Sequence, residues 1–271
     1  MHLLEVALFS FASLVVPFSG ISAAMAKTEK AGAPAPSGAV EAELREDTKQ
    51  AFKTQPEAAG LPRVLIIGDS ISIGYTAPLQ KLLSAKAAVS RAPGNCQDSG
   101  FGLQHIKQWV GKGPWDVIHF NFGIWDTHYL DAQTGQLIAL ESATPENKRR
   151  IRHNIEQYKA NLVKIVQALK QTKAQLIWAQ STPIMFRTAA RFDDIAKYNA
   201  AAAEVMNANS VPINDLYNYT LRDIKQWQSP DQCHFNDKGN AMLAQQVMRS
   251  ILAALELKQP RSATEMQKGE K

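Results

Sequence analysis

The sequence predicts an α/β fold in which a parallel five-stranded sheet lies between two layers of helices. Two observations support this prediction. Short apolar runs of strand-like composition alternate along the chain with longer segments of helical periodicity. The apolar runs are also rich in β-branched and aromatic residues, as expected of strands covered on both faces. Such alternation indicates parallel strands joined by crossover helices, and therefore a three-layer α/β/α architecture.

The five expected strands are the short apolar runs. They are residues 63–67, 87–90, 116–122, 175–180 and 211–213. Helical patterns fill the intervals between the strands. The expected helices are residues 74–84, 102–110, 147–171, 193–209, 216–226 and 237–257.

The carboxyl ends of these strands are expected to form one site, because ligands of such sheets bind there. Polar or glycine-containing segments follow four of the strands. These segments are Ser70, the Gly94 loop, residues 121–126 and residues 181–183.

The chain of 271 residues is expected to carry one folded domain, residues 61–257, between segments of different composition. Residues 1–26 are expected to be a signal peptide, because they are mostly apolar and end in the small-residue pattern Ala24-x-Ala26. An uncleaved membrane anchor is the alternative. Residues 27–60, rich in Ala, Pro and Glu, are expected to be a flexible linker with a short helix near residues 40–52, and residues 258–271 a polar tail.

This organisation predicts an exported protein, either periplasmic or secreted, without stable membrane insertion once the signal is removed. The formal net charge is +5, but the basic stripe with stacking aromatics that is typical of nucleic-acid binders is not evident. No histidine or carboxylate spacing suggests a metal site, and no glycine-rich loop with lysine suggests a nucleotide. We therefore expect no metal, no cofactor and no nucleic-acid partner, and leave the oligomeric state open.

Two short motifs carry the chemistry. Gly68-Asp69-Ser70 closes the first apolar run, and Asp231-x-x-His234 lies near the end of the chain. A nucleophilic serine needs a general base within hydrogen-bond reach, and that base needs a carboxylate to hold its tautomer. An aspartate three residues before a histidine can supply both the base and the group that orients it. A hydrolase is therefore the leading interpretation.

The two motifs resemble those of the SGNH, or GDSL-type, hydrolases. Gly68-Asp69-Ser70 does not fit the G-x-S-x-G elbow of α/β-hydrolases. The resemblance covers roughly residues 63–257 and implies the SGNH fold with flavodoxin-like topology. It also implies Ser70 as nucleophile, His234 as general base and then acid, Asp231 as the group that orients the imidazole, and no cofactor.

The resemblance further implies an oxyanion hole of three donors. They are the Ser70 N–H, a backbone N–H from the second sequence block and an asparagine side chain from the third. In the second block the alignment is not unique, so the backbone donor could belong to any of residues 94–97, Gly94 included. Asn95 could add its side-chain amide.

The third block departs from the family pattern G-x-N-D, because Trp125 stands where asparagine is expected. Tryptophan has one N–H and is much larger, so it cannot simply substitute. We expect the amide of Asn121 or of Asn95 to replace the missing donor. The alternative is that Asn121 only ties its strand to a loop. Trp125 and His128 follow this strand and are expected to line the substrate pocket, although core packing is equally consistent with Trp125.

The two cysteines are a candidate disulfide. Cys96 lies in the second block, and Cys233 directly precedes the histidine of the second motif. In an exported chain such a pair suggests a bridge that would fix the catalytic loop. Two separate thiols are the alternative.

The resemblance implies an ester substrate, either a small molecule or a glycan ester. Exported relatives often remove O-acetyl groups from carbohydrate, and the small, polar blocks do not suggest a long acyl tunnel. O-deacetylation is therefore the first hypothesis, and a lysophospholipase or thioesterase activity is the second. A catalytically inactive domain that binds polysaccharide is a third, motivated by Trp125.

Overall fold

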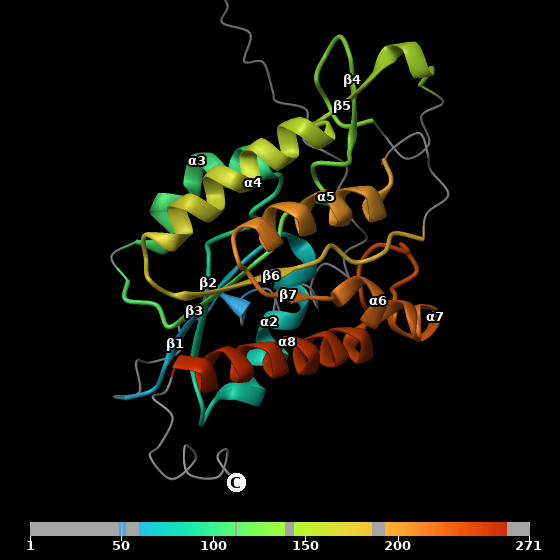
Figure 1. The fold of residues 1–271 in the computed structure, drawn as a ribbon. Coiled ribbons are helices and arrows are strands. Elements are labelled where there is room, and N and C mark those ends of the chain that lie inside the picture. The colour runs from blue at the N-terminus through green and yellow to red at the C-terminus, as the bar shows by residue number, and fades with distance from the viewer. Residues whose placement is uncertain are drawn as a thin grey trace, which may run out of the picture. The chain divides into compact units, whose positions relative to one another are not determined.

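The computed structural model describes residues 60–111, 113–138, 144–185 and 193–258, together with residues 49, 51 and 52. The expected signal peptide, almost all of the expected linker and all but the first residue of the expected polar tail lie outside the described residues. Within them, five parallel strands form a sheet of order β2-β1-β3-β6-β7 (Figure 1). The strands are β1 (Arg63–Ile67), β2 (Ala88–Arg91), β3 (Val117–Phe120), β6 (Gln175–Ala179) and β7 (Ile213–Asn214).

Helices cover both faces of this sheet, so the predicted three-layer α/β/α fold is confirmed. One face packs against α2 (Ser70–Leu83) and α8 (Asp237–Lys258), and the other against three helices (Figure 1). These three are α3 (Ser99–Val110), α4 (Ile155–Lys170) and α5 (Ile195–Ala208).

The two cores follow from the two-residue period of a strand. In β1, Val64 and Ile66 belong to the apolar cluster with α2 and α8, whereas Leu65 and Ile67 belong to the cluster on the opposite face. All four side chains are at most 2% exposed. A strand buried on both faces must be apolar throughout, which is why β1 reads as a continuous apolar run.

The expected helix over residues 147–171 is wrong at its amino end. Residues Glu146–Lys148 form a 3-10 turn, η1, and β5 (Arg149–Ile151) pairs antiparallel with β4 (Tyr129–Asp131) in a second, small sheet. Helix α4 starts only after Asn154, whose side chain accepts from the Gln157 N–H while the Gln157 side chain accepts from the Asn154 N–H. This reciprocal capping box fixes the start of the helix.

Capping residues also shift the starts of two other helices. Asp69 and Asp98 cap α2 and α3, so both helices begin several residues earlier than expected. The expected helix over residues 216–226 is divided into α6 (Leu216–Leu221) and α7 (Ile224–Trp227).

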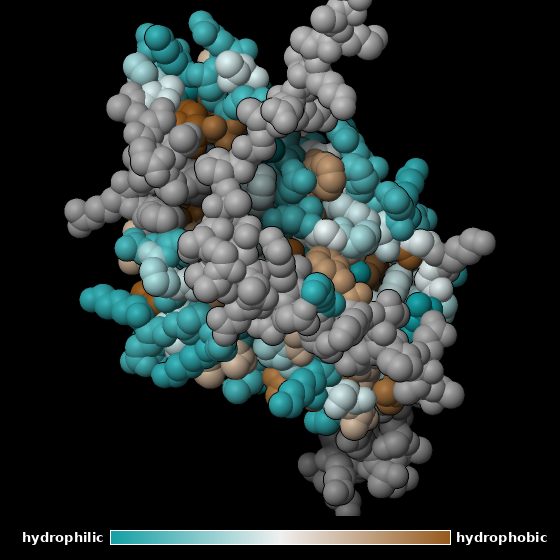
Figure 2. Space-filling view, turned by 180° about the vertical axis from the view of Figure 1, so that it is seen from behind, coloured by the Kyte–Doolittle hydropathy of each residue, from teal (hydrophilic) through white to brown (hydrophobic). Residues whose placement is uncertain are grey.

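Figure 2 shows the face opposite to that of Figure 1, on which hydrophilic side chains predominate among the described residues. The large apolar side chains that are exposed come from separate elements. They are Leu82, Leu137, Met185, Leu221 and Leu257. Among the described helices, none combines the length and the apolar character that crossing a membrane requires.

Candidate active site

Ser70 lies at the turn between β1 and α2. Asp69 caps α2 by accepting a hydrogen bond from the Ile71 N–H at 3.0 Å, which makes Ser70 the first residue of the helix. The N–H groups of a first helical turn have no acceptor within the helix. The Ser70 N–H is therefore free to donate to an anion at this end of α2.

Ser70 meets a histidine that is 164 residues away in the sequence. The Ser70 Oγ lies 2.8 Å from the Nε2 of His234. On the other side of the ring, the His234 Nδ1 lies 2.5 Å from the Oδ2 of Asp231. Because the carboxylate accepts from Nδ1, the neutral imidazole presents the lone pair of Nε2 to the serine hydroxyl.

The loop before α8 holds this arrangement. The Oδ1 of Asp231 accepts from the N–H groups of Cys233 at 3.1 Å and of His234 at 3.0 Å. Gln232, which lies between Asp231 and Cys233, has a φ of 55°, in the left-handed region, so the chain reverses there. The carbonyl of Gln232 accepts from the Met185 N–H at 3.0 Å, which ties the loop to the segment after β6.

These contacts shift two pKa values in opposite directions. Burial opposes ionisation of Asp231, but the hydrogen bonds from His234 and Cys233 outweigh it and lower the pKa of the carboxyl to about 2. The hydrogen bond to Asp231 raises the pKa of His234, against a smaller opposing effect of burial. Both side chains are 46% exposed, so the imidazole is accessible to solvent and to a large substrate.

The loop after β2 lies against the turn that carries Ser70. The Cys96 N–H donates to the Gly68 carbonyl at 3.2 Å, and the Gln97 N–H donates to the Asn95 Oδ1 at 2.9 Å. Two of the four backbone donors expected in this loop are thus already engaged. Among the described residues, nothing accepts from the N–H groups of Gly94 and Asn95. These two N–H groups remain available to donate.

The structure gives the Asn121 amide a different role from the expected one. Its Nδ2 donates to the Ala179 carbonyl at 2.7 Å and to the Ser181 Oγ at 3.3 Å, and the side chain is buried. An amide nitrogen has two hydrogens, so both are engaged. Asn121 therefore ties the end of β3 to the end of β6, as in the alternative interpretation, and its expected role as oxyanion donor is corrected.

Trp125 and His128 pack against each other after β3. Their rings are stacked, with centroids 5.3 Å apart and planes 3° apart, and the Arg152 guanidinium lies 5.5 Å from the Trp125 ring centroid. His128 is buried. Neither residue lines the cavity beside Ser70, whereas their neighbour Ile124 does.

That cavity has a volume of about 10 Å³, which is room for about one water molecule. Asp69 and Ile71, the two neighbours of Ser70, both line it. Three residues of its lining each carry a buried polar atom that has no hydrogen-bond partner among the described residues. These atoms are the Oδ2 of Asp69, the Oε1 of Gln180 and the Oγ1 of Thr182.

The expected disulfide is wrong in this structure, because both sulfurs are thiols. The Cys96 side chain is fully buried in the apolar cluster on the α3, α4 and α5 face. Cys233 lies in the partly exposed loop before α8. Burial raises the pKa of the Cys96 thiol to about 11, so this sulfur is kept in its unreactive form.

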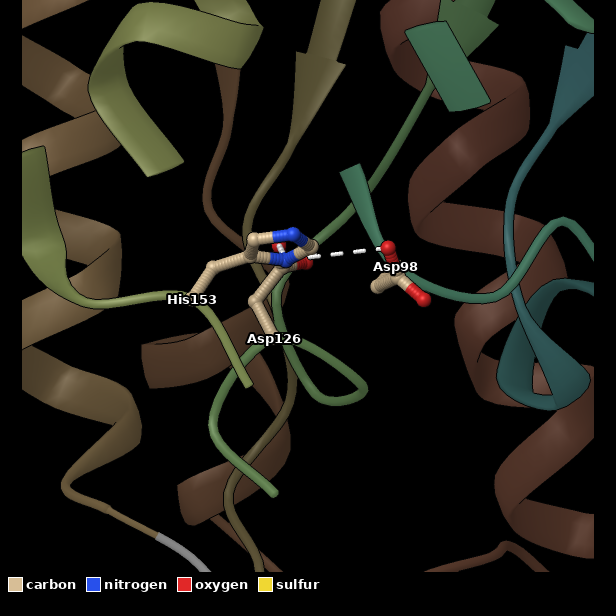
Figure 3. A group of neighbouring side chains, drawn as sticks. All are labelled: Asp98, Asp126 and His153. Atoms are coloured by element: carbon tan, nitrogen blue, oxygen red, sulfur yellow. Dashed lines mark hydrogen bonds and ion pairs between the residues drawn. The ribbon is translucent and has the colours of Figure 1, made fainter. Parts of the chain in front are cut away.

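A second group of ionisable side chains brings together Asp98, Asp126 and His153 from three segments of the chain (Figure 3). The Asp126 Oδ1 lies 2.9 Å from the Nδ1 of His153, and the Asp126 carboxylate also accepts from the N–H and the hydroxyl of Ser99. The Asp98 Oδ2 accepts from Arg152 at 2.9 Å. Burial raises the pKa of Asp126. Burial by itself would lower the pKa of His153, but the bond to Asp126 outweighs it and raises that pKa.

Asp98, Asp126 and His153 have ligand-type atoms within 4.8 Å of one another, the spacing of a metal site. However, every carboxylate oxygen of the two aspartates already accepts from an N–H or O–H group of the protein. The group is therefore satisfied as a hydrogen-bond network that anchors the loop to β3 and α4. No pattern of residue spacing along the sequence predicts this group, because its members come from three separate segments.

Comparison with known proteins identifies the family. Residues 66–242, well over half of the chain, match the model of the GDSL-like lipase/acylhydrolase family. This range contains Ser70, Asp231 and His234. No curated protein matches this chain at a significant level.

Several solved structures share the fold. A lipase/acylhydrolase from Enterococcus faecalis is 19% identical, with a TM-score of 0.58 over 75% of this chain and 100% of that one. An esterase from a Pseudoalteromonas species is 14% identical, with a TM-score of 0.52 over 72% and 98%. An acetylxylan esterase from Geobacillus stearothermophilus, solved as a catalytic mutant, is 16% identical, with a TM-score of 0.53 over 70% and 94%. The chain thus belongs to the GDSL-like lipase/acylhydrolase family and is a hydrolase of ester bonds.

Proposed function

We propose that this hydrolase is an exported serine esterase that removes O-acetyl groups from carbohydrate by an acyl-enzyme mechanism. The observation that carries the mechanism is the pair of hydrogen bonds that connects Ser70 through His234 to Asp231. This arrangement supplies a nucleophile, a base and a group that orients the base.

The reaction follows from this geometry. His234 Nε2 takes the hydroxyl proton as Ser70 Oγ attacks the ester carbonyl, and the carbonyl electron pair moves onto its oxygen. The Asp231 carboxylate stabilises the imidazolium that forms. The resulting oxyanion accepts from the Ser70 N–H at the start of α2 and from the loop after β2. His234 then gives the proton to the alcohol, which leaves, and water releases the acid by the same steps.

The cavity beside Ser70 supports a short acyl group. Its volume of about 10 Å³, room for about one water molecule, leaves no space for a long acyl chain. A long aliphatic chain would also lie against the unpartnered polar atoms of Asp69, Gln180 and Thr182. Leaving each such atom unsatisfied costs about 1–3 kcal/mol. This argues against the lysophospholipase or thioesterase alternative.

Two further observations support a carbohydrate as the alcohol. The exposed imidazole of His234 allows a bulky leaving group to approach from solvent. One structure of similar fold is an acetylxylan esterase, although a likeness at 16% identity shows only that the two chains share a fold. The signal peptide expected at residues 1–26 would place the enzyme outside the cytoplasm with such substrates.

A chain-length profile tests the proposal. We expect purified protein to hydrolyse p-nitrophenyl acetate at least tenfold faster than the octanoate or laurate ester, and to release acetate from acetylated xylan or another acetylated glycan. Ser70→Ala should abolish both activities. Equal or faster hydrolysis of the long esters would favour the lipase alternative, and a folded wild type that binds glycan without turnover would favour the inactive binding domain.

A further inference from the structure

A buried guanidinium connects the two backbone segments that meet at the site. Arg91, the last residue of β2, is 9% exposed. Its Nη1 donates to the Gly94 carbonyl at 3.0 Å, and its Nη2 donates to the Gly68 carbonyl at 3.0 Å and to the Ser72 Oγ at 2.8 Å. The Phe52 ring covers the guanidinium at 4.8 Å. One side chain therefore holds the loop after β2, the turn before Ser70 and the first turn of α2.

The contact with Gly94 sets the direction of one N–H. The carbonyl of Gly94 and the N–H of Asn95 belong to the same peptide unit, which is planar and trans, so the two groups point in opposite directions. Because Arg91 holds the carbonyl, the Asn95 N–H points away from the guanidinium. Nothing in the described part of the chain accepts from this N–H.

The contact with Ser72 sets the direction of a second N–H. The Ser72 hydroxyl accepts from Arg91 and donates to the Asp69 carbonyl at 2.7 Å. That carbonyl shares a peptide unit with the N–H of Ser70. The Ile73 N–H also donates to this carbonyl at 3.2 Å, so the helix and the chain from Arg91 through Ser72 together fix the plane in which the Ser70 N–H lies. A cation at the start of such a chain also polarises it and strengthens the final donor.

We propose that Arg91 is a positioning residue that orients both backbone donors of the oxyanion hole, the N–H groups of Ser70 and Asn95. The inference rests on the proposed esterase mechanism and extends it. It assigns the second backbone donor to Asn95 and explains how donors on two separate segments keep one geometry. Lysine cannot replace Arg91, because an ammonium lacks the planar fork that reaches Gly68, Ser72 and Gly94 together.

The test compares Arg91→Lys with Arg63→Lys. Arg63 is a matched control, because it also donates to a backbone carbonyl, that of Gly113, and lies 4.5 Å from an aromatic ring, but at the opposite end of β1. One misplaced oxyanion donor costs about 10²-fold in kcat. We expect Arg91→Lys to lower kcat on p-nitrophenyl acetate by about 10²-fold with KM within about threefold, and Arg63→Lys to leave both near wild type.

A transition-state analogue separates positioning from folding. A small alkylboronic acid forms a tetrahedral adduct with the serine, which places a negative oxygen in the hole. Its affinity for Arg91→Lys should fall by a factor similar to that in kcat. If Arg91 only stabilises the fold, Arg91→Lys should lower the melting temperature, and the protein that remains folded should keep both its kcat and its affinity for the boronic acid.

The outcomes are distinguishable. If the wild type shows no esterase activity, the proposed function fails first. If the wild type is active and folded Arg91→Lys keeps kcat and boronate affinity within threefold of Arg63→Lys, Arg91 does not position the donors. Should Arg91→Lys not fold, Ser72→Ala removes the bond from Arg91 and the bond to the Asp69 carbonyl but leaves the contacts of Arg91 with Gly68 and Gly94, and should lower kcat by about fivefold to tenfold. Unchanged kcat in Ser72→Ala would also overturn the proposal.

Discussion

Replacing Asp231 with asparagine tests how the carboxylate serves the imidazole. The substitution keeps the size of the side chain and the Oδ1 that accepts from the N–H groups of Cys233 and His234. It replaces the Oδ2 that lies 2.5 Å from the His234 Nδ1 with an amino group. That group donates to Nδ1 and so drives the ring proton to Nε2. The ring then presents a hydrogen, rather than a lone pair, to Ser70.

The expected magnitude follows from two losses. A hydrogen bond to a charged group contributes about 2 kcal/mol, and reversing the wrong tautomer requires breaking a new hydrogen bond at a cost of about 2 kcal/mol. Together they raise the barrier by about 4 kcal/mol, which lowers kcat about 10³-fold. The loss should be smaller than the roughly 10⁴-fold typical of a buried triad aspartate, because solvent reaches Asp231, which is 46% exposed.

The assay is kcat on p-nitrophenyl acetate, with Asp131→Asn as the matched control. Asp131 likewise accepts from two backbone N–H groups, those of Gln133 and Thr134, but lies on β4 and carries no histidine partner among the described residues. The control should keep wild-type kcat. A folded Asp231→Asn protein with kcat within tenfold of wild type would refute this account of the carboxylate.

Three further predictions concern pH and the acyl pocket. Activity should be lost as pH falls through the raised pKa of His234, so the acid limb of the pH profile of kcat/KM should have its midpoint above pH 6.5. A midpoint below that value would contradict the role of Asp231. His153 has a raised pKa beside Asp126 and Asp98, so its contribution to stability should be present in full below about pH 6.5 and lost as pH rises through the folded pKa. Urea unfolding of wild type and of His153→Gln should therefore show a difference in the free energy of unfolding that shrinks from pH 5.5 to pH 8.5. A difference that grows over this range would refute the prediction. Thr182→Val removes one unpartnered hydroxyl from the cavity, so kcat/KM for the butyrate ester should rise about fivefold relative to acetate, and an unchanged ratio would remove Thr182 from the acyl pocket.

The sheet was predictable because its strands are buried on both faces. A strand such as β1, with Val64 and Ile66 in one core and Leu65 and Ile67 in the other, has to be apolar at every position. The small β4–β5 sheet was not predictable in the same way. Ile151 continues the apolar stripe of α4, and only the capping box at Asn154 separates strand from helix.

For the site, sequence reasoning found the residues that form short motifs. The spacing in Gly68-Asp69-Ser70 and in Asp231-x-x-His234 is local, and the fold brings the two motifs together. Residues whose partners are distant were missed or misjudged. Arg91 contacts Gly68, and Asn121 contacts Ala179, only because β2, β1, β3 and β6 are neighbours in the sheet. Burial, which the sequence does not report, also decides that Cys96 remains a thiol.

The most direct measurement is mass-spectrometric mapping of the adduct formed with a fluorophosphonate, which reacts only with an activated serine. The account predicts a single phosphonyl group on Ser70, formed rapidly in wild type and lost when His234 is replaced by alanine. An intact, folded protein that forms no adduct, or one that is modified on Ser72 instead, would contradict it.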